Sequence, residues 1–288
     1  MVTPFRIDHP SRNVHVVRMD PAANEWWVLC QSDEHQDNPD CDRALLKAHH
    51  ELALERQAPI LKYGDFFCAM QGKYDKRSDK SKVREEHQGG DYLDALVRTG
   101  ADLLEPYAHH IVMLGRGNHE EAIHRRHETD ITERTCERLR ERTGAPVQAG
   151  GYGGWVRFLF ETEKGGGRRS VLAHYFHGAG GGGPVTKGVI QTNRRQDSIY
   201  ADIYLGGHVH EGWVLRRNRA TLNNGNRVVH ESGIHISTPG YKDEYKDGHG
   251  GWHVETGKPP KPKGCVWLHF ERDGHSRDIR ATAVEDFR

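Results

Sequence analysis

The amino-acid sequence predicts an α/β fold with a parallel or mixed sheet, and three observations support this class. In the first half, short apolar runs alternate with segments whose apolar residues recur at helical spacing. In the second half, strand-like runs predominate, separated by turns with Gly or Asn. Several apolar runs also end in polar residues suited to ligand binding, as strands of such sheets do. The length fits a single domain spanning residues 1–288.

The first quarter of the chain contains a strand, a helix and a further strand in succession. Residues 14–18 are expected to form an edge strand, and the apolar run at residues 26–30 a buried strand. Residues 42–56 place apolar side chains at helical spacing, with Lys, His and Glu between them. Residues 59–63 form the next apolar run. This order of elements is typical of a parallel or mixed sheet.

The middle of the chain repeats this alternation after one basic segment. Residues 73–84 are basic and polar, without an apolar period. A solvated loop is favoured there over a rim that attracts phosphate, and both interpretations stay open. Residues 91–104 are expected to form a helix, residues 110–114 a third buried strand, and most of residues 120–142 a charged helix.

The second half is expected to be rich in strands. The runs with strand character are residues 155–160, 170–175, 203–205, 213–216, 227–231 and 234–237. Residues 223–226, Asn-Asn-Gly-Asn, fit a hairpin turn between two of them. The glycine-rich residues 179–183 favour a flexible loop over one that binds phosphate with its amides. Residues 240–264 form a long irregular segment, expected to be a lid or substrate loop bordering the substrate cleft.

Net charge and cysteine content exclude several classes of protein. Lys plus Arg and Asp plus Glu number 41 each, so no overall positive field attracts the chain to nucleic acid or an anionic membrane. The five cysteines are odd in number, widely spaced and without a C-x-x-C pair, which argues against a disulfide framework or a zinc knuckle. No window approaches the ~18 apolar residues of a membrane span. We therefore expect a soluble, cytoplasmic protein without a membrane partner, in which any nucleic-acid binding is local.

Potential metal ligands stand at the ends of five predicted strands. They are Asp33 and His35, Asp65, Asn118 and His119, His177, and His208 and His210. Residues two apart in an extended backbone point to the same side, so the first and last pairs each present two ligands together. Sheets of this type collect ligands at the carboxyl ends of their strands. Oxygen and imidazole ligands suit Mn²⁺, Fe or Zn²⁺, and the set is large enough for two ions.

The ordered set resembles the signature of the calcineurin-like metallophosphoesterases, of the bacterial or phage type. That signature reads D-x-H, G-D, G-N-H-(D/E), a single H, and G-H-x-H. The blocks stand here, in the same order, as Asp33-Glu34-His35, Gly64-Asp65, Gly117-Asn118-His119-Glu120, His177-Gly178 and Gly207-His208-Val209-His210. The resemblance implies a four-layer α/β/β/α sandwich, in which helices flank two mixed sheets. It also implies a dinuclear metal centre.

The resemblance further implies a role for each of these residues. The metal ligands would be Asp33, His35 and His210 for one ion, Asn118, His177 and His208 for the other, and Asp65 as the bridge. His119 resembles the family's catalytic histidine, which contacts the phosphate and protonates the leaving group. His174 competes with His177 for the single-histidine position. We prefer His177 because it ends the apolar run and precedes a glycine.

One position departs from the family pattern. Most relatives continue the second block as G-D-x-x-D, and the second carboxylate orients the catalytic histidine, whereas Cys68 occupies that place here. The orienting role is thus either vacant or filled by another residue. The block at residues 116–120 also resembles Ser/Thr protein phosphatases, but residues 66–70 do not match the Y-V-D-R-G that follows G-D in that branch. This mismatch argues against a protein phosphatase.

These observations lead to one principal hypothesis and two alternatives. The principal one is a hydrolase, a phosphodiesterase that cleaves nucleic acid or nucleotides through a metal-bridging hydroxide. Residues 73–84 and 258–263, which are basic, favour nucleic acid. The favoured ions are two Mn²⁺, with Fe, Zn²⁺, Ni²⁺ or Mg²⁺ as alternatives. A phosphomonoesterase and a non-catalytic metal-containing binding module remain open, as does the oligomeric state.

Overall fold

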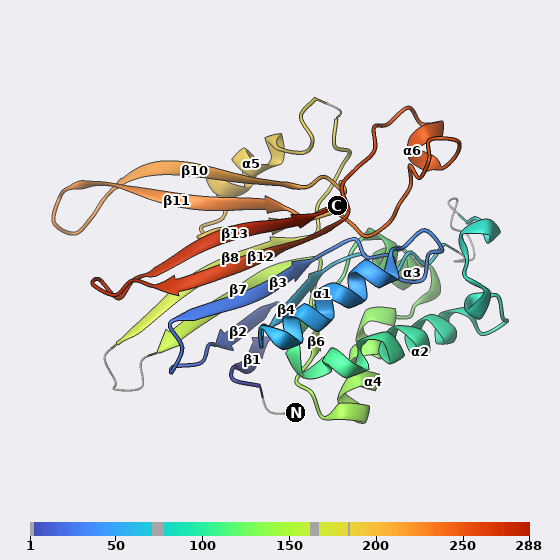
Figure 1. Cartoon of the computed structure of the whole chain (residues 1–288), viewed down its shortest axis with the longest axis horizontal. Coiled ribbons are helices and arrows are strands. Elements are labelled where there is room, and N and C mark those ends of the chain that lie inside the picture. Colours follow the sequence, from blue (N-terminus) through green and yellow to red (C-terminus); the bar gives the residue numbers. More distant parts are fainter. Residues whose placement is uncertain (1–2, 71–77, 162–166, 184) are drawn as a thin grey trace.

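The computed structural model describes residues 3–70, 78–161, 167–183 and 185–288, which form two β-sheets packed face to face (Figure 1). In these residues sheet A has seven strands, in the spatial order β1 (Arg6–Ser11), β2 (Val14–Arg18), β7 (Gly153–Glu161), β8 (Arg168–Phe176), β9 (Ile203–Gly206), β11 (Val228–Ser237) and β10 (Trp213–Leu222). Sheet B has six, in the order β13 (Ile279–Phe287), β12 (Gly264–Arg272), β3 (Glu25–Gln31), β4 (Ile60–Tyr63), β5 (Ile111–Gly115) and β6 (Gln148–Ala149). Both sheets are mixed.

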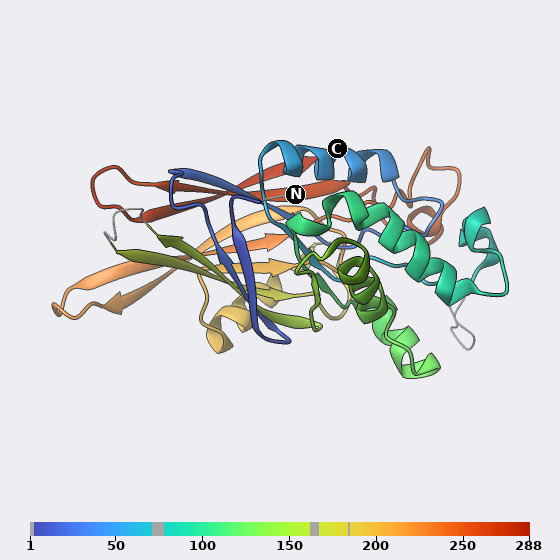
Figure 2. The ribbon, with the colours of Figure 1, turned by 90° about the horizontal axis from the view of Figure 1, so that it is seen from below.

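Helices cover the outer face of each sheet, which gives four layers (Figure 2). The helices are α1 (Arg43–Glu55), α2 (Tyr92–Leu104), α3 (Asn118–His127), α4 (Ile131–Thr143), α5 (Ile190–Ser198) and α6 (Trp252–Glu255), with 3₁₀ turns at Lys80–Lys82, Glu85–His87 and Glu105–His110. The helices α1, α2 and α4 lie on sheet B, and the single helix α5 lies on sheet A. The four-layer fold is therefore confirmed, with a reduced helical layer on sheet A.

Two apolar cores hold these layers together. One lies between the sheets and includes Val28, Phe158 and Phe270, each fully buried. The other lies between sheet B and its helices and includes Leu46 and Leu96. Sheet B is therefore apolar on both faces, which explains why its strands read as continuous apolar runs in the sequence.

The parallel strands of each sheet place the predicted ligands at one edge. The strands β3, β4 and β5 are parallel neighbours in sheet B, and β8, β9 and β11 are parallel neighbours in sheet A. Their carboxyl ends therefore meet at the same end of the sandwich. The segments that follow β3, β4, β5, β8 and β9 carry the five sequence blocks, the third of them in the first turn of α3.

Some predicted elements need correction. The charged helix expected within residues 120–142 is two helices, because Glu128 adopts a left-handed conformation (φ 53°) and Asp130 caps α4 through the amide of Glu133. The runs at residues 227–231 and 234–237 form one strand, since β11 continues through Gly233. The strands β1, β12 and β13 and the helix α5 were not predicted from the sequence. α5 lacks an apolar period, so no helical pattern marked it.

Two further findings concern the cysteines and the helices. All five cysteines are free and buried, so none of them forms a disulfide. Among the described residues, no helix combines the length and the apolar character needed to cross a bilayer.

Candidate metal centre

The first cluster of predicted ligands consists of Asp33, His35 and His210. The Nε2 atoms of His35 and His210 lie 3.3 Å apart, and Asp33 Oδ1 lies 3.4 Å from His210 Nε2. Asp33 Oδ1 is buried yet accepts no hydrogen bond. Ligand atoms bound at about 2.0–2.2 Å to one ion are roughly 3–3.5 Å from one another. The three side chains therefore fit a divalent cation between them.

The second cluster consists of Asn118, His177, His208 and Asp65. Asn118 Oδ1 lies 2.8 Å from His208 Nδ1 and 3.1 Å from His177 Nε2. Asp65 Oδ2 also lies 3.1 Å from His177 Nε2. The Nδ1 atom of His177 lies 3.3 Å from the carbonyl oxygen of Tyr63, so its N–H can donate there while Nε2 faces the other ligands. This set also fits one divalent cation.

The two clusters adjoin each other through His177. Its Nε2 atom lies 4.0 Å from Asp33 Oδ1 of the first cluster. Burial opposes the charge on His177, but Asp65 and Asp33 outweigh it and raise its pKa to about 9. Burial likewise opposes ionisation of Asp65, but His177 and His119 outweigh it and hold its pKa well below the usual range. In the metal-free chain a proton on His177 thus offsets the carboxylates, and a cation would take over that role.

The backbone at this edge is unusual. The predicted ligands with positive φ are Asp33 (55°), His35 (47°), Asp65 (52°), His208 (70°) and His210 (54°). Left-handed conformations of residues other than glycine cost about 1–3 kcal/mol each. Their concentration at the predicted ligands indicates that the fold holds these side chains in place at the expense of local strain.

Two glycines of the sequence blocks allow this close approach of the loops. A Cβ atom on Gly117 would collide with the carboxylate and amide of Asp65. A Cβ atom on Gly207 would collide with the side chains of Ser32 and Asp33. The glycines before Asn118 and His208 are therefore required because the next loop occupies the place of a side chain.

Glu120, the last residue of its block, holds the loops after β4 and β5 together. Its carboxylate accepts hydrogen bonds from the amides of Phe67 (2.8 Å), Gly117 (2.9 Å) and Asp65 (3.2 Å). Burial, followed by the charge of Asp65, raises the pKa of Glu120 to about 8. Its contacts position the loops after β4 and β5 relative to each other.

His119 lies at the edge of the clusters with one ring nitrogen fixed. Its Nδ1 atom lies 2.5 Å from the carbonyl oxygen of Cys68, and its amide donates to Asp65 Oδ1 (2.9 Å). Its Nε2 atom lies 3.9 Å from Asp65 Oδ2. A carbonyl oxygen only accepts hydrogen bonds, so the Nδ1–H donates to it and Nε2 is the atom that can act on a substrate.

The structure identifies what replaces the missing carboxylate at Cys68. The main-chain carbonyl of Cys68 orients His119, while its thiol accepts a hydrogen bond from Asn38 (3.2 Å). The carboxylate of Asp37 accepts hydrogen bonds from the amides of Cys68 (2.5 Å) and Ala69 (2.9 Å), which fixes this loop. Sequence reasoning missed Asp37, although its place four residues after Asp33 was a signal that it lies near the site.

His174 lies apart from both clusters. Its ring packs edge-on against Trp155, and its Nδ1 accepts a hydrogen bond from Arg195 (2.9 Å). Burial and the charge of Arg195 lower its pKa to about 4. Of the two candidates for the single-histidine position, only His177 lies among the other predicted ligands.

The clusters open into a cavity of about 750 Å³. Of the predicted site residues, those that line the cavity are His35, Asp65, Asn118, His119, His208 and His210. The segment 240–264 contributes Lys242, Glu244, Gly251, Trp252, His253, Glu255, Lys258 and Lys261, so it borders this cavity. From the basic segment 73–84, Asp79, Ser81 and Lys82 line it, and residues 73–77 lie outside the described part of the chain. The glycines 180–182 of the glycine-rich run also reach it.

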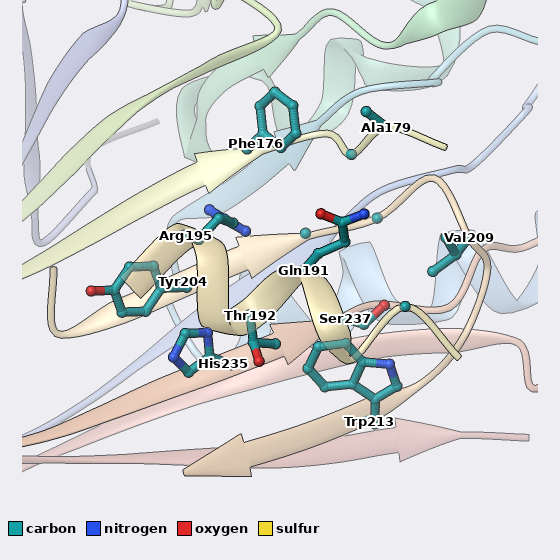
Figure 3. Close-up of a pocket in the computed structure, with 14 residues that line it drawn as sticks. Phe176, Ala179, Gln191, Thr192, Arg195, Tyr204, Val209, Trp213, His235 and Ser237 are labelled. Carbon is teal, nitrogen blue, oxygen red and sulfur yellow. The ribbon is translucent and has the colours of Figure 1, made fainter. Parts of the chain in front are cut away.

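A smaller pocket of about 100 Å³ lies beneath α5 on the outer face of sheet A (Figure 3). The guanidinium of Arg195 lies 5.9 Å from the ring centre of Phe176 and 5.7 Å from that of Tyr204. Arg195 donates to the carbonyl oxygens of Leu205 (2.9 Å) and His174 (2.8 Å). Arg195 therefore fastens α5 to the strands β8 and β9, and Val209 lines both this pocket and the larger cavity.

Comparisons with known proteins concern the fold. No protein family and no curated protein matches the chain. Among solved structures, a predicted phosphoesterase from Streptococcus pneumoniae shares 11% identity over 91% of this chain and 100% of its own, with a TM-score of 0.30. A metallophosphoesterase from Sphaerobacter thermophilus shares 13% over 91% and 89% (TM-score 0.35), and Vps29 of Chaetomium thermophilum 10% over 91% and 97% (TM-score 0.35).

The fold and the ligand clusters can be described from the chain's own residues. Two mixed sheets flanked by helices carry the five ordered blocks at one edge, which is the four-layer arrangement expected from the sequence. The clusters at that edge have ligand types and spacings suited to divalent cations.

Proposed function

We propose that the chain is a dinuclear metal-dependent phosphodiesterase whose substrates are nucleic acids or nucleotides. The observation that carries this proposal is the pair of adjoining ligand clusters with His119 beside them. Asp65 is assigned as the bridge because it lies against His177 and its charge also acts on His35. Two divalent cations, when bound, polarise a phosphoryl oxygen and lower the pKa of a water that attacks the ester.

His119 supplies the proton that the leaving group needs. With Nδ1–H donated to the Cys68 carbonyl, the ring keeps one orientation in both its neutral and its protonated state. In the protonated state Nε2–H can pass its proton to the departing alkoxide. A purely structural histidine would not need its Nε2 to face the cavity between the ligands and the substrate. His119 therefore supports an enzyme over a non-catalytic binding module.

The residues that line the cleft favour a substrate in which a nucleobase is connected to the phosphate. Trp252 is 48% exposed at the cleft, and Lys258 Nζ lies 3.3 Å from its ring centre. An exposed aromatic ring next to a cation suits stacking of a nucleobase close to a phosphate. Lys261 is held in the same wall by the carbonyl oxygen of Val209 (2.5 Å) and by Glu211 (3.4 Å). Inorganic phosphate alone would not contact the ring of Trp252 and would fill only part of the cleft.

A comparison of substrates tests the proposal. The chain loaded with Mn²⁺ is assayed on a small aryl phosphodiester, an aryl phosphomonoester, cyclic nucleotides and single-stranded oligonucleotides. We expect diesters to be cleaved faster than the monoester, and Trp252→Ala to raise KM for nucleotides more than for the small diester. A preference for the monoester would favour a phosphomonoesterase. Binding of two ions without cleavage of any ester would favour a binding module.

A further inference from the structure

A third group of potential ligands lies away from the predicted dinuclear centre. His49 from α1, Cys265 from β12 and Asp286 from β13 place one nitrogen, one sulfur and one oxygen within 4.8 Å of one another. Cys265 and Asp286 are register partners on adjacent antiparallel strands, and α1 packs over β12. The group therefore lies on the outer face of sheet B, beneath the helical layer.

The ring of His49 has one nitrogen held and one free. Its Nδ1 atom lies 2.7 Å from the hydroxyl of Tyr241, which also accepts a hydrogen bond from Gln31 (2.6 Å). If His49 carries its proton on Nδ1, both bonds to the hydroxyl are satisfied and Nε2 keeps its lone pair. That Nε2 atom is buried, forms no hydrogen bond, and lies 3.5 Å from Asp286 Oδ2. A buried imidazole nitrogen that keeps its lone pair beside a carboxylate, with a thiol in the same group, is suited to bind a metal ion.

We propose that His49, Cys265 and Asp286 bind a structural zinc ion. Nitrogen, thiolate and carboxylate are the ligands zinc prefers, and one ion brings such atoms roughly 3–4 Å apart. The other ring nitrogen of His49 is held by Tyr241, and Asp286 accepts a bond from the indole of Trp267 (3.3 Å), which are the outer contacts such ligands need. The side chain of Asp286 is 37% exposed, so water can fill the fourth position.

The charges around the group are compatible with the ion. Thiolate and carboxylate together offset the charge of Zn²⁺. Burial raises the pKa of the Cys265 thiol well above its usual value, so zinc binding releases the thiol proton to solvent. The positive charge of Arg56 acts against this rise in the pKa of Cys265, and the positive charge of Arg288 adds to burial in lowering the pKa of His49. The guanidinium of Arg56 lies over the rings of Trp27 (4.1 Å) and Trp267 (4.4 Å) and is not a ligand.

Such an ion would connect β12 and β13 with the edge of the sandwich that carries the predicted ligands. It joins β12 and β13 to α1, and through His49 it fixes the hydroxyl of Tyr241. The amide of Tyr241 in turn donates to the carbonyl oxygen of Asp33 (3.0 Å). The zinc site therefore supports, through one residue, the loop that carries the first predicted ligand.

Cobalt spectroscopy tests this site separately from the dinuclear centre. The protein is stripped with a chelator and loaded with Co²⁺, and its ultraviolet absorption is recorded. Only a cobalt–sulfur bond gives a thiolate charge-transfer band, and none of the ligands assigned to the dinuclear centre is a thiolate. We expect the wild type to show this band, Cys265→Ser to lose it, and Asp286→Asn to require at least tenfold more Co²⁺ to form it.

Cys68 provides the matched control, because its thiol lies near His35 and His119 in a competing group. Cys68→Ser should keep the band. Absence of the band from the wild type, its survival in Cys265→Ser, or its loss in Cys68→Ser would overturn the proposal. If Cys265→Ser does not fold, Asp286→Asn decides, since its side chain is partly exposed: titration of the cobalt band against a chelator should show at least tenfold weaker binding than in the wild type, and equal affinity would overturn the site.

Discussion

His174 and His177 lie three residues apart at the end of β8, on opposite sides of sheet A. His177 lies among carboxylates, and its pKa is raised to about 9. His174 lies against Arg195, and burial together with that cation lowers its pKa to about 4. The difference arises from what neighbouring strands and helices bring to each face, since residues an odd number apart on a strand point to opposite sides. Substitutions at the edge that carries the predicted ligands and on the outer face of sheet A should therefore have different effects.

The largest effect is expected at Asp65. Asp65→Asn should lower turnover of a phosphodiester roughly 1000-fold, about 4 kcal/mol of barrier, because it weakens both ion sites at once. Replacing one terminal histidine such as His208 should cost less, and His174→Gln should cost little. Steady-state kinetics at saturating Mn²⁺ measures these losses. Equal losses for Asp65→Asn and a terminal-histidine variant would count against the bridge.

His174, on the outer face of sheet A, should make the stability of the fold depend on pH in acid. The folded-state pKa of His174 is about 4, below the ordinary 6.5, so the unfolded chain binds more protons between these values. The stability that a neutral His174 provides is complete above pH 6.5 and is lost as pH falls to about 4, by about 3 kcal/mol. His174→Gln removes this loss while keeping an acceptor for Arg195. Urea unfolding at pH 7 and pH 4 measures it, and an equal acid loss in both proteins would contradict it.

Cys68 tests whether the main chain orients His119. Cys68→Asp adds a buried carboxylate next to Asp37, which already binds the amide of Cys68. We expect it to destabilise the fold by about 1–3 kcal/mol without improving turnover. Cys68→Ser should leave turnover nearly unchanged, because the carbonyl remains. A Cys68→Asp enzyme that is faster on substrates with poor leaving groups would show that the thiol position, not the carbonyl, governs His119.

Metal affinity should depend on pH through His177. Below pH 9 the metal-free ring is protonated, and an ion must displace that proton to bind. Affinity should therefore rise about tenfold per pH unit from pH 7 to about 9. Calorimetry in buffers with different ionisation enthalpies measures the released proton. Affinity independent of pH in this range would mean that the carboxylates do not hold a proton on His177.

The sequence allowed prediction of those parts of the fold and site that depend on side-chain pattern. The apolar runs marked β3, β4 and β5, and the order of the five blocks gave the residues that meet at one edge. What orients His119 could not be predicted, because every residue has a carbonyl oxygen and only the loop path decides which one reaches the ring. The break between α3 and α4 depends on one left-handed residue, Glu128, which no pattern marked.

The group of His49, Cys265 and Asp286 shows a further limit of sequence patterns. Its members are separated by 216 and 21 positions and lie on three elements. Only the antiparallel pairing of β12 with β13 brings the last two together, and neither strand was identified from the sequence. Spacing rules for zinc sites detect ligands on one loop or hairpin, so they did not detect this group.

The central claim is a dinuclear centre that uses His177 and excludes His174. Electron paramagnetic resonance of the active, Mn²⁺-loaded protein tests it most directly, because two bridged Mn²⁺ ions give an exchange-coupled spectrum that isolated ions do not. We predict that the wild type and His174→Ala show the coupled spectrum and that His177→Ala loses it together with activity. A spectrum of isolated Mn²⁺ in the active wild type, or loss of coupling in His174→Ala with His177→Ala unaffected, would contradict the claim.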